Sequence, residues 1–120
     1  RRRQRQMCIR DRSRDFTYVD NAIQANLAAM SRESQFGFEV MNIACGDRLS
    51  VNDLFENLKL SLSKYIPDVS KIEVIHSEER EGDILHSHAD ISKAIQLIDY
   101  EVLVGVEAGL QSTVDWFMQN

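Results

Sequence analysis

Short runs of β-forming residues alternate along this chain with segments whose apolar side chains recur at helical spacing. The clearest helical segment follows Ser50. Ser50 and Asp53 are three positions apart, the spacing of an N-cap residue and its partner in the first turn. Its apolar side chains, which recur every three or four residues, are Val51, Leu54, Phe55, Leu58, Leu62 and Ile66. Pro67 is expected to end this helix, because the residue before a proline disfavours the helical conformation. Alternation of this kind is typical of an α/β fold.

The remaining pattern predicts three strands and three further helices. The strands are expected at residues 16–19, 38–44 and 71–75, and the helices after Asp20, at 91–98 and at 106–118. The side chains expected to face the core are Ile23, Leu27 and Met30 in the first of these helices, and Val106, Leu110, Val114 and Phe117 in the last. Asp20 and Asp90 are interpreted as helix caps, and Gly109 is expected to allow close packing. We therefore expect a small α/β domain with a few short strands and about four helices.

Composition restricts the chain to one globular domain. It has 120 residues, of which 43% are hydrophobic, and a single proline. No apolar run approaches the roughly 18 residues of a membrane span, and no secretory signal is recognisable. We expect a cytoplasmic protein without a membrane partner, whose cysteines, Cys8 and Cys45, are reduced and unpaired.

The charge is distributed unevenly. Residues 1–12 contain six arginines and one aspartate, whereas the formal net charge of the chain is −5. A basic arm can bind nucleic acid, because clustered arginines neutralise phosphates. The string RRRQRQMCIRDR, however, resembles library adaptor that was translated as coding sequence, so we expect residues 1–12 to be non-native and residues 13–120 to form the domain. On that interpretation nucleic acid is not a partner.

Two stretches bring a guanidinium and a carboxylate close together in sequence. They are residues 14–20 (RDFTYVD) and residues 80–83 (REGD). Arginine provides a planar fork for phosphate oxygens, and aspartate accepts hydrogen bonds from hydroxyl groups, so the combination suits a nucleotide-sugar. The structural alternative is an exposed ion pair of little energetic value in the first stretch and an ordinary turn at Gly82 and Asp83 in the second.

Other polar and aromatic residues favour structural roles. His86, His88 and Asp90 have a metal-like spacing, but a zinc site needs a further fixed ligand and His76 lies ten residues away, so we expect no metal. Cys45 is interpreted as a small buried residue at a strand end. The adjacent aromatic side chains at 116 and 117 are interpreted as part of the core.

Several segments, in this order, resemble the C-terminal part of the NAD-dependent sugar epimerase/dehydratase family, the extended short-chain dehydrogenases. They are residues 14–20 (RDFTYVD), 42–46 (NIACG), 80–83 (REGD), 86–94 (HSHADISKA), and 109–110 with 114–117 (GL, VDWF). The resemblance extends over residues 14–120, and among members of the family the sequence is most similar to UDP-N-acetylglucosamine 4-epimerases.

The resemblance implies a nucleotide-sugar ligand, most readily a UDP-sugar, and assigns roles to four residues. Arg14 and Arg80 would hold the diphosphate, Asp83 would accept hydrogen bonds from the ribose hydroxyls, and Ser87 would line the nucleotide pocket. Members of the family bind NAD in an N-terminal Rossmann domain and oxidise a sugar carbon of the substrate. This chain would provide the substrate side, and remote binding of this kind helps to hold the reacting sugar in place.

The chain departs from the family in lacking its catalytic half. It has no Gly-x-x-Gly-x-x-Gly turn, and none of its three tyrosines is followed by a lysine four positions later. We therefore expect no catalytic residue and no NAD bound by this chain alone, with NAD and homodimerisation belonging to the missing N-terminal domain. An apolar face made for that domain should be exposed, and stability should be marginal. A GDP- or dTDP-sugar enzyme, or a binding module with a basic arm, are the alternatives.

Overall fold

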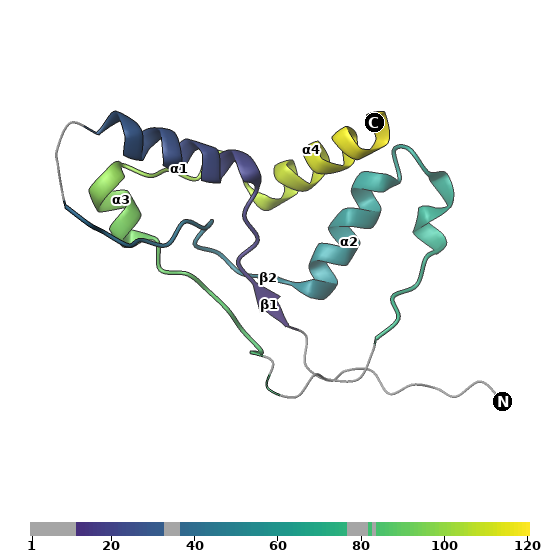
Figure 1. Ribbon diagram of the computed structural model, residues 1–120. Helices are drawn as coiled ribbons and strands as arrows, with labels where there is room; N and C mark the ends of the chain where they lie inside the picture. Colours follow the sequence, from purple (N-terminus) through teal and green to yellow (C-terminus); the bar gives the residue numbers. More distant parts are fainter. Residues whose placement is uncertain (1–11, 33–36, 77–81, 83) are drawn as a thin grey trace.

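The computed structural model describes residues 12–32, 37–76, 82 and 84–120. In chain order its elements are β1 (Ser13–Arg14), α1 (Val19–Ser31), β2 (Leu49–Ser50), α2 (Val51–Leu62), the 3₁₀ helix η1 (Pro67–Lys71), α3 (Ser92–Ile98) and α4 (Val106–Gln119). Figure 1 shows that α1 lies beside α3 and that α2 lies beside α4, with β1 and β2 between the two pairs. The expected α/β class with four α-helices is confirmed.

A small sheet joins the two helix pairs. β1 and β2 are antiparallel, with Ser13 opposite Ser50 and Arg14 opposite Leu49. On its other edge, β1 forms a parallel bridge between Ser13 and His86. The Ser13 amide donates to the Leu85 carbonyl at 3.0 Å, and its carbonyl accepts from the Ser87 amide at 3.1 Å. β1 is therefore the central strand of three segments that are distant in sequence.

The core lies between α1 and α3. It is formed by the buried side chains of Ala25, Ala94, Ile98 and Tyr100, against which Ala28, Met41, Ile43, Ile91 and Leu97 pack. The Tyr100 hydroxyl donates to the Ala44 carbonyl at 2.8 Å, which satisfies its polar atom inside the core. This hydrogen bond also fixes the end of residues 38–44 against the helices.

α4 packs closely at Gly109 against Tyr18, the residue before α1, so the expectation of close packing at this glycine is confirmed. A Cβ atom added at Gly109 would lie 2.7 Å from the Cβ of Tyr18, which is shorter than any normal contact. Ser50 caps α2 as expected, because its Oγ accepts from the Asp53 amide at 3.0 Å. Asp90 accepts from the Ser92 amide at 2.9 Å, but it lies one position before Ile91, the N-cap residue of α3, so it is not the cap residue that was expected. Asp20 lies inside the first turn of α1 and is likewise not its N-cap residue.

The predicted strands are wrong in position. Residues 16–18 form no strand, and Val19 already begins α1. Residues 38–43 keep the side-chain alternation of a strand, since Met41 and Ile43 pack on the core whereas Phe38 and Val40 are 92% and 68% exposed. No partner strand for them lies among the described residues, so the ladder that defines a strand is absent. Lys71 ends η1, and residues 72–75 likewise form no ladder within the described chain.

The helix after Ser50 ends earlier than predicted. α2 stops at Leu62, and the amides of Tyr65 and Ile66 bond to the Leu62 carbonyl in the turn that follows. Pro67 begins η1, where its fixed φ and missing N–H are tolerated. Ile66, the last apolar residue of the predicted pattern, therefore lies in the turn and not in α2.

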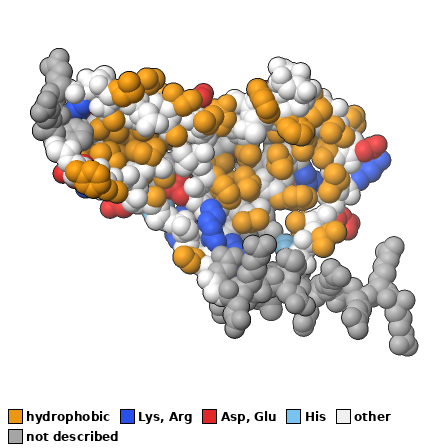
Figure 2. Space-filling view, viewed as in Figure 1, with side chains coloured by type: hydrophobic (Ala, Val, Ile, Leu, Met, Phe, Trp, Pro, Cys, Tyr) orange, Lys and Arg blue, Asp and Glu red, His pale blue; other side chains and the backbone are white. Residues whose placement is uncertain are grey.

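Several side chains predicted to face the core are exposed instead. On α1, Leu27 is 60% and Met30 82% exposed, and Ile23 is also exposed. On α4, Trp116 and Phe117 are exposed as well, so the interpretation of these aromatics as core residues is wrong. Figure 2 shows hydrophobic side chains gathered over both helix pairs. The helical spacing was predicted correctly, but the described part of the chain provides no surface to cover these faces.

Candidate functional site

Arg14 lies on the central strand, at the junction with residues 85–87. Its Nη1 donates to the Ser13 carbonyl at 2.8 Å and is 3.4 Å from the Leu85 carbonyl. The side chain is half-buried. Its position is thus defined by backbone carbonyls on two neighbouring segments, and basic side chains gather in this part of the molecule (Figure 2).

Ser87 is next to Arg14 in space although they are distant in sequence. Its amide donates to the Ser13 carbonyl, one residue before Arg14. The side chain of Ser87 is exposed. Of the four predicted site residues, the structure brings these two together, and Arg80 and Asp83 lie outside the described residues. Gly82 has a φ of 81°, a left-handed conformation that favours glycine.

Asp15 has a role that the sequence analysis missed. Its two carboxylate oxygens accept hydrogen bonds from the amides of Cys45 and Gly46, at 2.9 and 3.0 Å. Two consecutive backbone N–H groups that converge on one point form an anion-binding concavity. Here the chain's own carboxylate fills it, so Asp15 ties the strand that carries Arg14 to the turn at Gly46. No sequence motif distinguishes this aspartate from the ion-pairing or ligand-binding aspartates considered above.

The turn at Gly46 is held from a second side by the segment that carries Ser87. His88 Nε2 lies 3.0 Å from the Gly46 carbonyl oxygen, and His86 Nδ1 lies 2.8 Å from Ser13 Oγ. Gly46 has a φ of 70°, and a Cβ at this position would lie 3.0 Å from Cδ1 of Ile91. Glycine is therefore required here by backbone conformation and by space.

Cys45 is a free thiol in this turn. Partial burial and the nearby Asp15 carboxylate raise its pKa above the ordinary thiol value. Both effects disfavour the thiolate, which is the nucleophilic form of cysteine. Cys45 was interpreted as a small buried residue at a strand end, but its side chain is only partly buried and residues 38–44 form no ladder within the described chain.

The histidines form structural contacts rather than a ligand cluster. Among the residues that the structure describes, no group of three or more His, Cys, Asp or Glu side chains could hold a metal ion.

Within the same residues, no helix is long and apolar enough to span a membrane.

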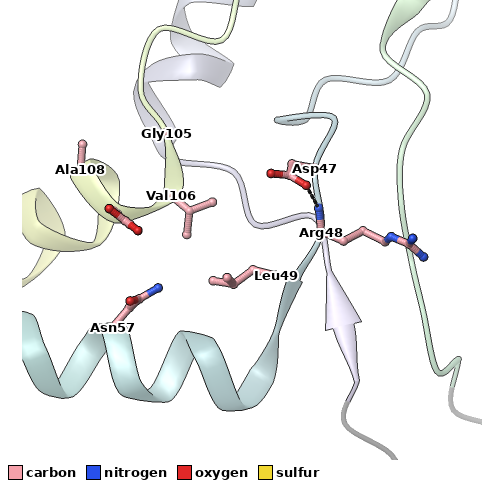
Figure 3. A pocket seen from close by; sticks show the side chains of 8 residues that line it. Asp47, Arg48, Leu49, Asn57, Gly105, Val106 and Ala108 are labelled. Atoms are coloured by element: carbon pink, nitrogen blue, oxygen red, sulfur yellow. Dashed lines mark hydrogen bonds between the residues drawn. The ribbon is translucent and has the colours of Figure 1, made fainter.

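A pocket of about 430 Å³ opens beside β2, between α2 and the start of α4. It is lined by Asp47, Arg48, Leu49, Asn57, Gly105, Val106, Glu107 and Ala108. Figure 3 shows the side chains of Leu49, Asn57 and Val106 directed into this space, whereas the Arg48 guanidinium points away from it. Neither Arg14 nor the residues whose carbonyls it contacts, Ser13 and Leu85, line this pocket, although Leu49 is paired with Arg14 in the sheet.

Comparison with curated proteins finds UDP-sugar epimerases. No protein-family profile matches the chain. A UDP-glucuronate 4-epimerase of Thermodesulfobacterium geofontis is 31% identical over 109 residues, which are 90% of this chain and 31% of that protein. A putative UDP-glucose 4-epimerase of Methanocaldococcus jannaschii is 29% identical over 110 residues, 92% of this chain and 32% of that protein. The chain spans about a third of the length of these relatives.

Solved structures agree with the sequence matches. A UDP-glucose 4-epimerase of Thermotoga maritima, solved with UDP-glucose, has a TM-score of 0.77 and 33% identity, covering 95% of this chain and 34% of that one. A UDP-N-acetylglucosamine 4-epimerase of Methanobrevibacter ruminantium, solved with UDP-N-acetylmuramic acid, has a TM-score of 0.75 and 34% identity, covering 91% and 32%. The fold is that of the C-terminal region of these proteins.

Proposed function

We propose that this chain, a homologue of the UDP-sugar epimerases that corresponds to their C-terminal region, binds the nucleotide diphosphate of a UDP-sugar. Arg14 and Arg80 would hold the two phosphates, Asp83 the ribose hydroxyls, and Ser87 one wall of the nucleotide pocket. The observation that carries this proposal is the pairing of β1 with residues 85–87, which brings Ser87 next to Arg14. Asp83 precedes Leu85 by only two positions in the chain, which supports a common site.

The chemistry of Arg14 suits a diphosphate. A guanidinium is permanently charged and donates to two phosphate oxygens at once, so it orients the ligand as well as attracting it. Partial burial strengthens this attraction, because fewer water molecules screen the charge. The carbonyls of Ser13 and Leu85 hold the side chain in place before any ligand binds.

The exposed apolar faces support a second part of the proposal, that residues 13–120 function within a longer polypeptide. Ile23, Leu27 and Met30 form a continuous exposed stripe on α1, and contiguous patches of this kind mark interaction surfaces. Residues 38–43 add an extended segment with strand-like alternation and no partner strand among the described residues. The relatives are about three times as long as this chain, so they contain the additional sequence that such surfaces require.

In this proposal the longer polypeptide supplies the chemistry. NAD binding, the acid and base groups, and homodimer contacts would come from the part of the relatives that this chain does not match, and the chain itself contributes substrate binding. Three solved relatives contain NAD. The Tyr-x-x-x-Lys couple and the Gly-rich turn are absent from this sequence, which agrees with such a division.

Titration of the 120-residue chain with UDP by calorimetry or NMR tests the proposal. We expect weak binding that Arg14→Gln reduces roughly tenfold or more, because a charge-assisted hydrogen bond is worth about 1.5–3 kcal/mol. Arg32→Gln is the matched control, since Arg32 pairs with Asp99 at the end of α1. Equal binding by wild type and Arg14→Gln would contradict the assignment. Competition with GDP and dTDP separates a UDP-sugar site from the other nucleotide-sugar classes.

A further inference from the structure

Arg14 and Asp15 are consecutive residues with contacts to different segments. Successive side chains of an extended segment point to opposite faces. Arg14 contacts the carbonyls of Ser13 and Leu85, whereas Asp15 contacts the amides of Cys45 and Gly46. The pair therefore contacts two different segments: Arg14 contacts the segment that carries Ser87, and Asp15 holds the strand to the turn at Gly46.

The turn that Asp15 holds is also bound by two other side chains. Tyr100, a core residue that is 2% exposed, donates to the carbonyl of Ala44 at 2.8 Å. His88 contacts the carbonyl of Gly46 from the segment that carries Ser87. Because the turn is bound to the core and Asp15 is bound to the turn, the carboxylate fixes the end of β1 relative to the core.

We propose that Asp15 is a positioning residue, whose carboxylate, through its hydrogen bonds to the Cys45 and Gly46 amides, sets the place of the Arg14 guanidinium at the ligand diphosphate. The inference rests on the proposed function and adds a residue to it. Both carboxylate oxygens of Asp15 accept from backbone amides, so its effect on binding is transmitted through Arg14.

The substitution Asp15→Asn tests this inference. The asparagine side-chain oxygen can still accept from one of the two backbone amides, whereas its NH₂ group faces the other amide, also a donor, so one hydrogen bond is lost. We expect Asp15→Asn to weaken UDP binding by about three- to tenfold, the worth of one hydrogen bond. Uridine has no diphosphate that could contact Arg14, so Asp15→Asn should bind uridine with the same affinity as the wild type. A merely structural role would lower the affinities for UDP and uridine together.

A double-mutant cycle adds a second readout. In the background of Arg14→Gln, Asp15→Asn should have no further effect on UDP affinity, since the group through which it acts is gone. Asp99→Asn is the matched control, because asparagine tolerates the left-handed conformation found at Asp99, with φ 52°. It should leave UDP affinity unchanged.

The outcomes separate the inference from the proposed function. If Arg14→Gln weakens UDP binding and Asp15→Asn does not, or if the two effects add, the positioning role is refuted and the proposed function stands. If Arg14→Gln has no effect, the proposed function fails first. Should Asp15→Asn not fold, Asp15→Glu moves the carboxylate by one methylene and is expected to show the same selective loss for UDP; equal losses for UDP and uridine would overturn the inference.

Discussion

Asn21 and Val104, which are 83 residues apart in sequence, are joined by hydrogen bonds in both directions. Asn21 Nδ2 donates to the Val104 carbonyl at 2.7 Å, and its Oδ1 accepts from the Val104 amide at 3.0 Å. The side chain is completely buried and also accepts from the Leu103 amide. A side-chain amide thus replaces a strand partner for residues 103–104 and anchors α1 to the segment before α4.

Asn21→Ala should therefore be strongly destabilising. It leaves three partly buried backbone groups of residues 103 and 104 without their partner, and each unsatisfied group costs about 1–3 kcal/mol when fully buried. We expect a loss of about 3 kcal/mol or more in the free energy of unfolding, measured by urea denaturation. Asn26→Ala is the matched control, because Asn26 is exposed and bonds only within its own helix. Equal losses for the two variants would contradict the anchoring role.

Gly109→Ala should destabilise the protein although alanine is the better helix former. The added methyl group would lie 2.7 Å from the Cβ of Tyr18, which outweighs a gain in helix propensity of about 1 kcal/mol. Gly105→Ala adds the same group where no atom lies within 4 Å, so its effect on the melting temperature should be smaller. A higher melting temperature for Gly109→Ala would show that α4 does not pack on Tyr18 in solution.

The carboxyl group of Asp90 gives a pH-dependent contribution to stability. Hydrogen bonds from the Ser92 hydroxyl and amide lower its pKa below the ordinary value. A group whose pKa is lower in the folded state stabilises the protein above its unfolded pKa, and this contribution is lost as the pH falls below about 4. Ser92→Ala should raise the pKa of Asp90 in an NMR titration and flatten the acid limb of the stability profile. An unchanged Asp90 titration in that variant would refute the assignment.

The exposed stripe on α1 should tolerate polar substitution in this chain. Leu27→Gln and Met30→Gln should change the free energy of unfolding by less than about 1 kcal/mol, while reducing dye binding and concentration-dependent association. Ile98→Ala is the contrasting variant, since Ile98 is 3% exposed and its truncation should cost about 2–4 kcal/mol. A large loss of stability from Leu27→Gln would mean that this face is covered within the chain itself.

Local patterns predicted the helices better than the strands, for a physical reason. A helix satisfies its own backbone, so the spacing of apolar residues and the cap at Ser50 were sufficient to place α2. A strand requires a partner, and the pattern at residues 38–44 could not reveal whether one lies nearby. The core face of α1 could not be predicted either, because spacing groups Ile23 with Leu27 without saying what covers them.

The candidate site was predictable only in part. The charge of Arg14 and the family resemblance indicated phosphate binding. The structure shows that Ser87 lies beside Arg14. The role of Asp15 depends on two amides about thirty residues away, a contact that no local pattern encodes. Arg80 and Asp83 lie outside the described residues, so their part in the site stays a prediction.

The central position of β1 has a consequence for the order of folding. Each helix can begin to form from nearby residues, but the bridge from Ser13 to His86 closes a loop of 73 residues. Closing a long loop costs chain entropy before any contact compensates for it, so contacts of this kind tend to form late. The surface that carries Arg14 and Ser87 is therefore expected to form after the individual helices, and a nucleotide added during refolding should accelerate or stabilise that later stage and leave helix formation unchanged.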